Sequence, residues 1–147
     1  MLTPQKILVP IDFTACSHKA REEALALAGA LGARVHLLHV YGIDGLPDDA
    51  TLLTSAHATE EAAQQKLNEL LRTLPSRSAV VEARARLGDP ARTIVEVASE
   101  LGVDLVVMGT HGRRGVTRLF LGSVAEAVLR SAPCTVMVVR EGHPARG

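Results

Sequence analysis

The chain has 147 residues, of which 47% are hydrophobic and 2% aromatic, and its formal net charge is zero. This length and hydrophobicity suit one folded domain and exclude a disordered chain, and the scarcity of aromatic rings argues against a surface that stacks on single-stranded nucleic acid. The balanced charge offers no broad electrostatic footprint for nucleic acid or for an anionic membrane.

The N-terminal half alternates between short apolar runs and longer helical patterns. A β-branched run predicts a strand at Gln5–Ile11, and helix formers follow at Ser17–Leu31, with a serine at the start and Gly32 just past the end. A second strand is expected at Arg34–Val40. An apolar stripe at helical spacing then predicts a helix over Thr54–Leu74.

The C-terminal half repeats this alternation. Val80–Leu87 alternates small or apolar with charged residues, as an edge strand does. A helix is expected at Pro90–Leu101, where the proline suits the first turn. Strands are expected at Leu105–Gly109 and Thr135–Val139, on either side of a helix at Ser123–Ser131.

Strands that alternate with helices predict an α/β fold, with a parallel sheet covered by helices on both faces. We expect one domain over residues 1–147, with a core at about residues 4–140 and a loose C-terminal tail. The start lacks a signal-peptide pattern, no apolar run approaches the roughly 20 residues of a membrane span, and the two cysteines lack disulfide-like spacing. The cytoplasm is therefore the expected location, and neither membrane nor nucleic acid is an expected partner.

Glycines gather after the fourth predicted strand and before the helix that follows it. Gly109 and Gly112 frame one turn, and after nine further residues Gly122 and Ser123 open the helix. Ligands of open α/β sheets bind outside the carboxyl ends of strands, where glycine lets them approach the backbone, and a helix start favours an anion. The stretch therefore predicts a cradle for a ligand and its phosphates. It is not a P-loop, because no lysine precedes Ser123, and the first strand is not followed by GxGxxG.

The pattern G-x2-G-x9-G-[S/T] resembles the ATP-binding signature of the universal stress protein family. The resemblance extends over nearly the whole chain, since KILVPID is similar to that family's first strand with its acidic residue, LLHV to its second strand and SAPCTVMVV to its last. It implies an open five-stranded parallel sheet in the order 3-2-1-4-5, a Rossmann-like fold of the adenine nucleotide alpha hydrolase-like kind. Asp12 and Gly109 would then flank one crevice. The turn at Phe13–Cys16 is bulkier than the small, polar turn common in the family, and we expect it to alter the nucleoside end.

The same resemblance implies a site for ATP, or for ADP or AMP, with Mg²⁺ or Mn²⁺ held through the phosphates. The residues implied at the nucleoside and ribose are Pro10, Ile11, Asp12, Val40, Met108 and Gly109. Those implied around the phosphates are His111, Gly112, Gly122, Ser123 and Val124. Val40 would contribute backbone groups to the adenine.

Several polar side chains have more than one interpretation. Asp12 could cap the turn that follows it, accept hydrogen bonds from ribose hydroxyls or hold a metal-bound water. His36 and His39 fall on opposite faces of one strand, so they do not form a local metal pair and are expected to be packing or surface residues. Three arginines between the glycines either form a solvated basic loop or contact phosphates: Arg113, Arg114 and Arg118.

The sequence has no identifiable Ser-His-Asp or Cys-His arrangement, so a dedicated enzyme is not expected. The leading hypothesis is an ATP-binding universal stress protein that acts in stress response or signalling, with a regulatory protein partner that the sequence does not identify. One alternative is a slow ATPase with a switching loop, and another is a dimeric interaction module that binds no nucleotide. The last strand, Thr135–Val139, has no lysine or proline to guard an open sheet edge, which predicts a homodimer paired through it, as the resemblance also implies.

Overall fold

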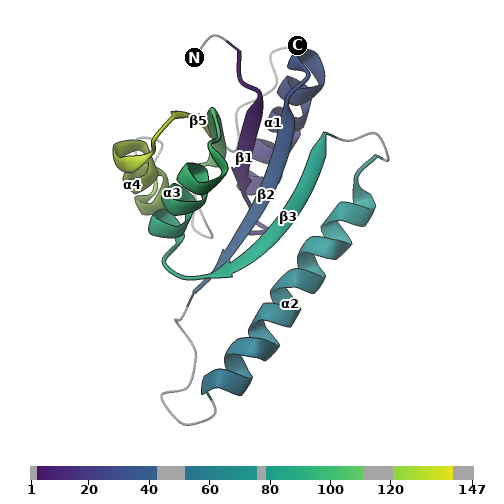
Figure 1. Ribbon diagram of the computed structural model, residues 1–147, viewed down its shortest axis with the longest axis vertical. Coiled ribbons are helices and arrows are strands. Elements are labelled where there is room, and N and C mark those ends of the chain that lie inside the picture. Colours follow the sequence, from purple (N-terminus) through teal and green to yellow (C-terminus); the bar gives the residue numbers. More distant parts are fainter. Residues whose placement is uncertain (1–2, 43–51, 76–78, 111–120, 141–147) are drawn as a thin grey trace.

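The computed structural model describes residues 3–42, 52–75, 79–110 and 121–140. Five parallel strands form one sheet in the order β3-β2-β1-β4-β5 (Figure 1). Their bounds are β1 Lys6–Pro10, β2 Arg34–Tyr41, β3 Val80–Leu87, β4 Leu105–Gly109 and β5 Thr135–Val139. The predicted fold class and strand order are confirmed. The expected loose tail, residues 141–147, lies outside the described residues.

Helices cover both faces of the sheet. They are α1 Ala15–Leu31, α2 Leu52–Thr73, α3 Pro90–Leu101 and α4 Ser123–Ser131. One core lies under α1 and α2 and buries Val9 and Leu37, whereas the other lies under α3 and α4 and buries Leu8 and Leu38. Neighbouring residues of one strand therefore face opposite cores, as the pleat of a strand requires.

Helix α1 lies close to the sheet because its inward stripe is small. Ala20, Ala24 and Ala28 are buried at a spacing of four residues, so they share one side of the helix. The helix ends at Gly32, whose φ of 70° is the left-handed backbone that glycine adopts readily. The small stripe brings the start of α1 against the end of β4.

The predicted helices and strands agree with the observed ones to within two residues at either end. None of the helices, over the described part of the chain, combines the length and the apolar character needed to cross a membrane.

The strands β1 and β4 are neighbours in the sheet, yet the helices that follow them lie on opposite faces. The chain from β1 continues into α1 on one face, and the chain from β4 leads to α4 on the other. Because α1 and α4 lie on opposite faces, the carboxyl ends of β1 and β4 border a crevice between the two helix starts. This is the topological switch point at which open α/β sheets bind ligands.

Candidate functional site

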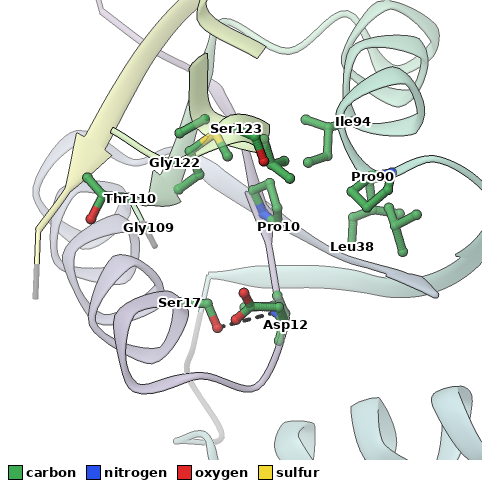
Figure 2. Close-up of a pocket in the computed structure, with 15 residues that line it drawn as sticks. Pro10, Asp12, Ser17, Leu38, Pro90, Ile94, Gly109, Thr110, Gly122 and Ser123 are labelled. Atoms are coloured by element: carbon green, nitrogen blue, oxygen red, sulfur yellow. Dashed lines mark hydrogen bonds between the residues drawn. The ribbon is translucent and has the colours of Figure 1, made fainter. Parts of the chain in front are cut away.

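A cavity of about 260 Å³ lies at the switch point, beside the carboxyl ends of β1 and β4 (Figure 2). Its walls come from three strands and from the starts of α1, α3 and α4. They consist of Pro10, Ile11, Asp12, Ser17, Leu38, Val40, Pro90, Ile94, Met108, Gly109, Thr110, Gly122, Ser123, Val124 and Ala125. The volume is near the lower end of the range of about 300–1,000 Å³ for small-molecule pockets.

Every implied site residue within the described part of the chain lines this cavity. These residues are Pro10, Ile11, Asp12, Val40, Met108, Gly109, Gly122, Ser123 and Val124. The other implied residues, His111 and Gly112, lie outside the described residues, as do the three arginines of the same connection. The fold thus brings four separate segments of the sequence to one place, and their role in binding a ligand stays a prediction.

Asp12 lies in the turn between β1 and α1 and is hydrogen-bonded within it. Its Oδ1 accepts a hydrogen bond from the backbone N–H of Thr14 at 2.9 Å and another from the Thr14 hydroxyl. The N–H of Asp12 donates to Oγ of Ser17 at 3.3 Å (Figure 2). Asp12 is exposed and Ser17 is buried. The turn-capping interpretation of Asp12 therefore holds, and the capped turn keeps its carboxylate at the cavity wall.

Gly109 ends β4 where the helix α1 passes directly over it. A Cβ atom at this position would lie 2.8 Å from Sγ of Cys16 and 3.0 Å from its backbone carbon. Cys16 is itself buried, and its thiol donates to the carbonyl of Val139 at 3.3 Å. The next residue, Thr110, is buried and its N–H donates to the same carbonyl at 3.1 Å. Gly109 therefore presents only backbone to α1, because a side chain there would meet Cys16.

The start of α4 differs from the starts of α1 and α3. Thr14 caps α1 by accepting from the N–H of Ser17, and Asp89 caps α3 by accepting from the N–H of Arg92. The N-cap of α4 is Gly122, with φ of 91°, and no side chain among the described residues caps this end. A helix start presents its first backbone N–H groups and the positive end of its dipole, both of which favour an anion.

The other end of the cavity is apolar. Leu38, Pro90 and Ile94 lie together on the side opposite Gly109, Thr110 and Gly122 (Figure 2). Sequence reasoning missed these three apolar residues. Leu38 carried a usable signal, because it precedes Val40 by two residues in one strand and must share its face. Pro90 and Ile94 belong to α3, whose placement over the sheet no local pattern reveals.

Three further cavity residues were also outside the sequence prediction: Ser17, Thr110 and Ala125. The sequence predicts Ser17 at the start of the helix that follows the first strand. That prediction already places a polar side chain near the carboxyl end of the strand. It lies inside α1, and its hydroxyl donates to the carbonyl of Thr14 at 3.2 Å. Thr110 directly follows Gly109 of the motif, and this position is a signal that it lies near the cavity.

His39 is half-buried on the opposite face of the sheet from the cavity. Its Nδ1 lies 2.7 Å from the carbonyl oxygen of Ile11, and since a carbonyl only accepts, Nδ1 carries the proton. Its ring packs edge-on against Phe13, with 4.8 Å between centroids. Burial lowers the pKa of His39 and outweighs the hydrogen bond to Ile11, which raises it; the charge of Lys66 lowers the pKa further, and the charge of Asp12 raises it. The neutral ring is therefore the favoured form.

Within the described residues, no group of three or more His, Cys, Asp and Glu side chains is placed to hold a metal ion. Asp12 is the one carboxylate among the lining residues. The arrangement suits a ligand with an apolar, nucleoside-sized part at one end and an anionic group at the start of α4.

Comparison with known proteins agrees with this architecture. The sequence pattern of the universal stress protein family matches residues 3–140. Universal stress protein MJ0531 of Methanocaldococcus jannaschii is 32% identical over 140 residues, which cover 93% of this chain and 82% of that protein.

Two solved structures have the same fold. Hypothetical protein MJ0577, whose biochemical function was assigned from its structure, is 27% identical with a TM-score of 0.83, covering 95% of this chain and 98% of that one. A universal stress protein in complex with cAMP is 24% identical with a TM-score of 0.61, covering 93% and 97%. The family match, the curated relative and the shared fold together show that the chain belongs to the universal stress protein family.

Proposed function

We propose that this chain binds ATP, or the related ADP or AMP, in the cavity at the switch point, and that binding serves stress response or signalling. The observation that carries the proposal is the pairing of an apolar cavity end with the uncapped start of α4. An adenine nucleotide has the matching pair of groups, an apolar base and a chain of phosphates. The cAMP in the complex of a related protein is also an adenine nucleotide.

In this proposal the base lies against Leu38, Val40 and Ile94, and the phosphates extend toward Gly122 and Ser123. The carboxylate of Asp12 faces the ribose, whose hydroxyls are donors that a carboxylate accepts. Mg²⁺ or Mn²⁺ would be held through the phosphate oxygens, which are hard ligands of the kind that these ions prefer. Asp12 is the one lining carboxylate that could contribute to such an ion.

We also propose that two copies pair through β5. It lies at the edge of the sheet, where no strand of the described residues pairs with its outer side, and Val136, Met137 and Val138 are only partly buried. A second copy of β5 would satisfy the open backbone groups and cover these apolar side chains. The cysteines Cys16 and Cys134 are both free, which fits a reducing compartment and the cytoplasmic location that we propose.

The phosphate end is tested by placing a negative charge at the start of α4. Ser123 is exposed and is the first residue of that helix, so Ser123→Asp introduces no steric conflict with a core. An anion in the first turn stabilises a helix by about 0.3–1 kcal/mol. We therefore expect Ser123→Asp to keep or raise the melting temperature while it weakens ATP binding at least tenfold in calorimetric titration.

Two controls distinguish repulsion between the new charge and the phosphates from a general disturbance of the site. Ser131→Asp adds the same charge at the far end of α4 and should leave ATP affinity unchanged. Adenosine has no phosphate, so the affinity of the Ser123→Asp variant for adenosine should match that of the wild type. Wild-type ATP affinity in the Ser123→Asp variant would contradict the assignment of the phosphates to this helix start.

A further inference from the structure

One side chain on the far face of the sheet contacts the residues on both sides of Asp12. Nδ1 of His39 donates to the carbonyl of Ile11 at 2.7 Å, and the His39 ring packs edge-on against Phe13 at 4.8 Å and 64°. The N–H of Ile11 donates to the carbonyl of Leu38, also at 2.7 Å. Both polar backbone groups of Ile11 are thus bound to β2 at the point where the chain leaves β1.

Phe13 has an unusual backbone that needs such support. Its φ is 62°, the left-handed region, and it is the one non-glycine residue with positive φ among those the structure describes. Bulky side chains rarely adopt this conformation. The ring is 40% exposed, yet His39 packs against it and the Nζ of Lys66 in α2 lies 5.6 Å from its centroid. These contacts come from the face of the sheet opposite the cavity.

The consequence for Asp12 is geometric. With Ile11 bound to β2 and Phe13 held in the left-handed region, the backbone on either side of Asp12 is fixed. The carboxylate is then directed into the turn, where its Oδ1 accepts from Thr14. The turn that carries the cavity's one lining carboxylate is thus in contact with a side chain behind the sheet.

We propose that His39 is a positioning residue of the nucleotide site, which acts through the Ile11–Phe13 turn to hold Asp12 at the cavity wall. This inference rests on the proposed function, because it assigns Asp12 to the bound nucleotide. It goes beyond that function by including a residue that lies outside the cavity and touches no ligand.

Two substitutions separate the hydrogen bond from the ring. His39→Asn keeps a nitrogen donor in the position of Nδ1 but removes the ring, whereas His39→Phe keeps a ring and removes the donor. His36→Phe is the matched control, since it makes the same change in the same strand on the opposite face. His36 bonds Glu82 at 3.0 Å and does not line the cavity.

The first measurement needs no nucleotide. Amide hydrogen exchange of Thr14, followed by NMR, reports the bond from its N–H to Asp12 directly. We expect His39→Phe to accelerate this exchange by about tenfold, the effect of losing one hydrogen bond. His39→Asn should stay within about threefold of wild type, and His36→Phe should leave the exchange unchanged.

The second measurement is calorimetric titration with ATP and Mg²⁺ in a double-mutant cycle with Asp12→Asn. If His39 acts through Asp12, His39→Phe should weaken binding about tenfold in the wild-type background and less than about twofold in the Asp12→Asn background. A general loss of stability would weaken binding equally in both backgrounds.

The outcomes test the positioning role of His39 and the proposed function separately. Equal weakening in both backgrounds, or wild-type exchange and affinity in His39→Phe, would overturn the positioning role. If the wild-type protein binds no ATP, the proposed function fails and the role at a nucleotide site fails with it. The exchange of Thr14 would even then show whether His39 holds the turn.

Discussion

At Gly109 the sheet and α1 approach each other closely. Any side chain there would meet Cys16, and its nearest neighbours are the thiol, the backbone carbon and Cβ of that residue, at 2.8, 3.0 and 3.1 Å. The thiol could move, but the backbone carbon belongs to a packed helix. The glycine is therefore required by the approach of two backbones, in addition to any role beside a ligand.

We predict that Gly109→Ala lowers the free energy of unfolding by about 1–3 kcal/mol, the usual effect of overpacking a core. Urea denaturation measures this change. Cys16→Ala in the same chain should restore only part of the loss, because the backbone contact remains.

Gly29→Ala is the control for Gly109→Ala. Gly29 lies inside α1 with nothing within 4 Å of an added Cβ, so its replacement should raise stability by up to about 1 kcal/mol. A Gly109→Ala variant as stable as the wild type would contradict a requirement for glycine between α1 and β4.

Phe13 shows how an unfavourable backbone is offset by contacts. A left-handed conformation costs about 1–2 kcal/mol for a residue with a Cβ. An edge-on aromatic pair contributes about 0.5–1.5 kcal/mol, and an exposed cation–π contact about 0.5–1 kcal/mol. The contacts with His39 and Lys66 are therefore large enough to balance the strain.

At the scale of elements, three helix starts surround the cavity, and the sequence predicts them unequally well. Pro90 and Gly102 bracket α3 as expected, and its observed bounds match the predicted ones. Helix α1 begins at Ala15 rather than Ser17. Three residues could cap it, Asp12, Thr14 and Ser17, and the cap is Thr14, which has an extended backbone and accepts from the N–H of Ser17. Local sequence cannot choose among such neighbours.

The cap of α3 gives an element-scale prediction. The carboxylate of Asp89 accepts from the N–H of Arg92 at 3.0 Å, so Asp89→Ala should lower the free energy of unfolding by about 1 kcal/mol. Asp89→Asn keeps an acceptor oxygen and should remain close to wild type. Thermal denaturation of the two variants distinguishes them, and an equal loss in both would assign the effect to charge instead of capping.

At the scale of the whole molecule, the sheet order places the two motif segments together, and this could be anticipated from the sequence only through the family resemblance. The alternation of strands and helices fixes the fold class, since it requires parallel strands with crossovers. It does not fix which strands are neighbours. The resemblance supplied the order, and with it the meeting of Asp12 and Gly109 across β1 and β4.

Contacts between distant parts of the chain could not be predicted from the sequence, for the same reason that the strand order could not. Ile94 and the contact between His39 and Ile11 depend on how elements lie across the sheet, and residues distant in sequence leave no local signal of such contacts. The left-handed backbone of Phe13 could not be predicted either, because phenylalanine rarely adopts a positive φ.

The open edge of β5 gives a prediction for the assembly. Sedimentation equilibrium at micromolar concentration should give twice the mass of 15.6 kDa that one chain has. Met137→Lys places a charge among the partly buried apolar residues of that strand and should shift the mass toward the monomer. A monomeric wild type at these concentrations would contradict pairing through β5.

The central claim is that the cavity at the switch point binds an adenine nucleotide. It is tested most directly by calorimetric titration of ATP with Mg²⁺ into protein stripped of any bound nucleotide, with released phosphate assayed over hours. We predict saturable binding near one ATP per chain and little phosphate released. Steady release would indicate a slow ATPase, and an absence of binding by ATP, ADP and AMP would contradict the account.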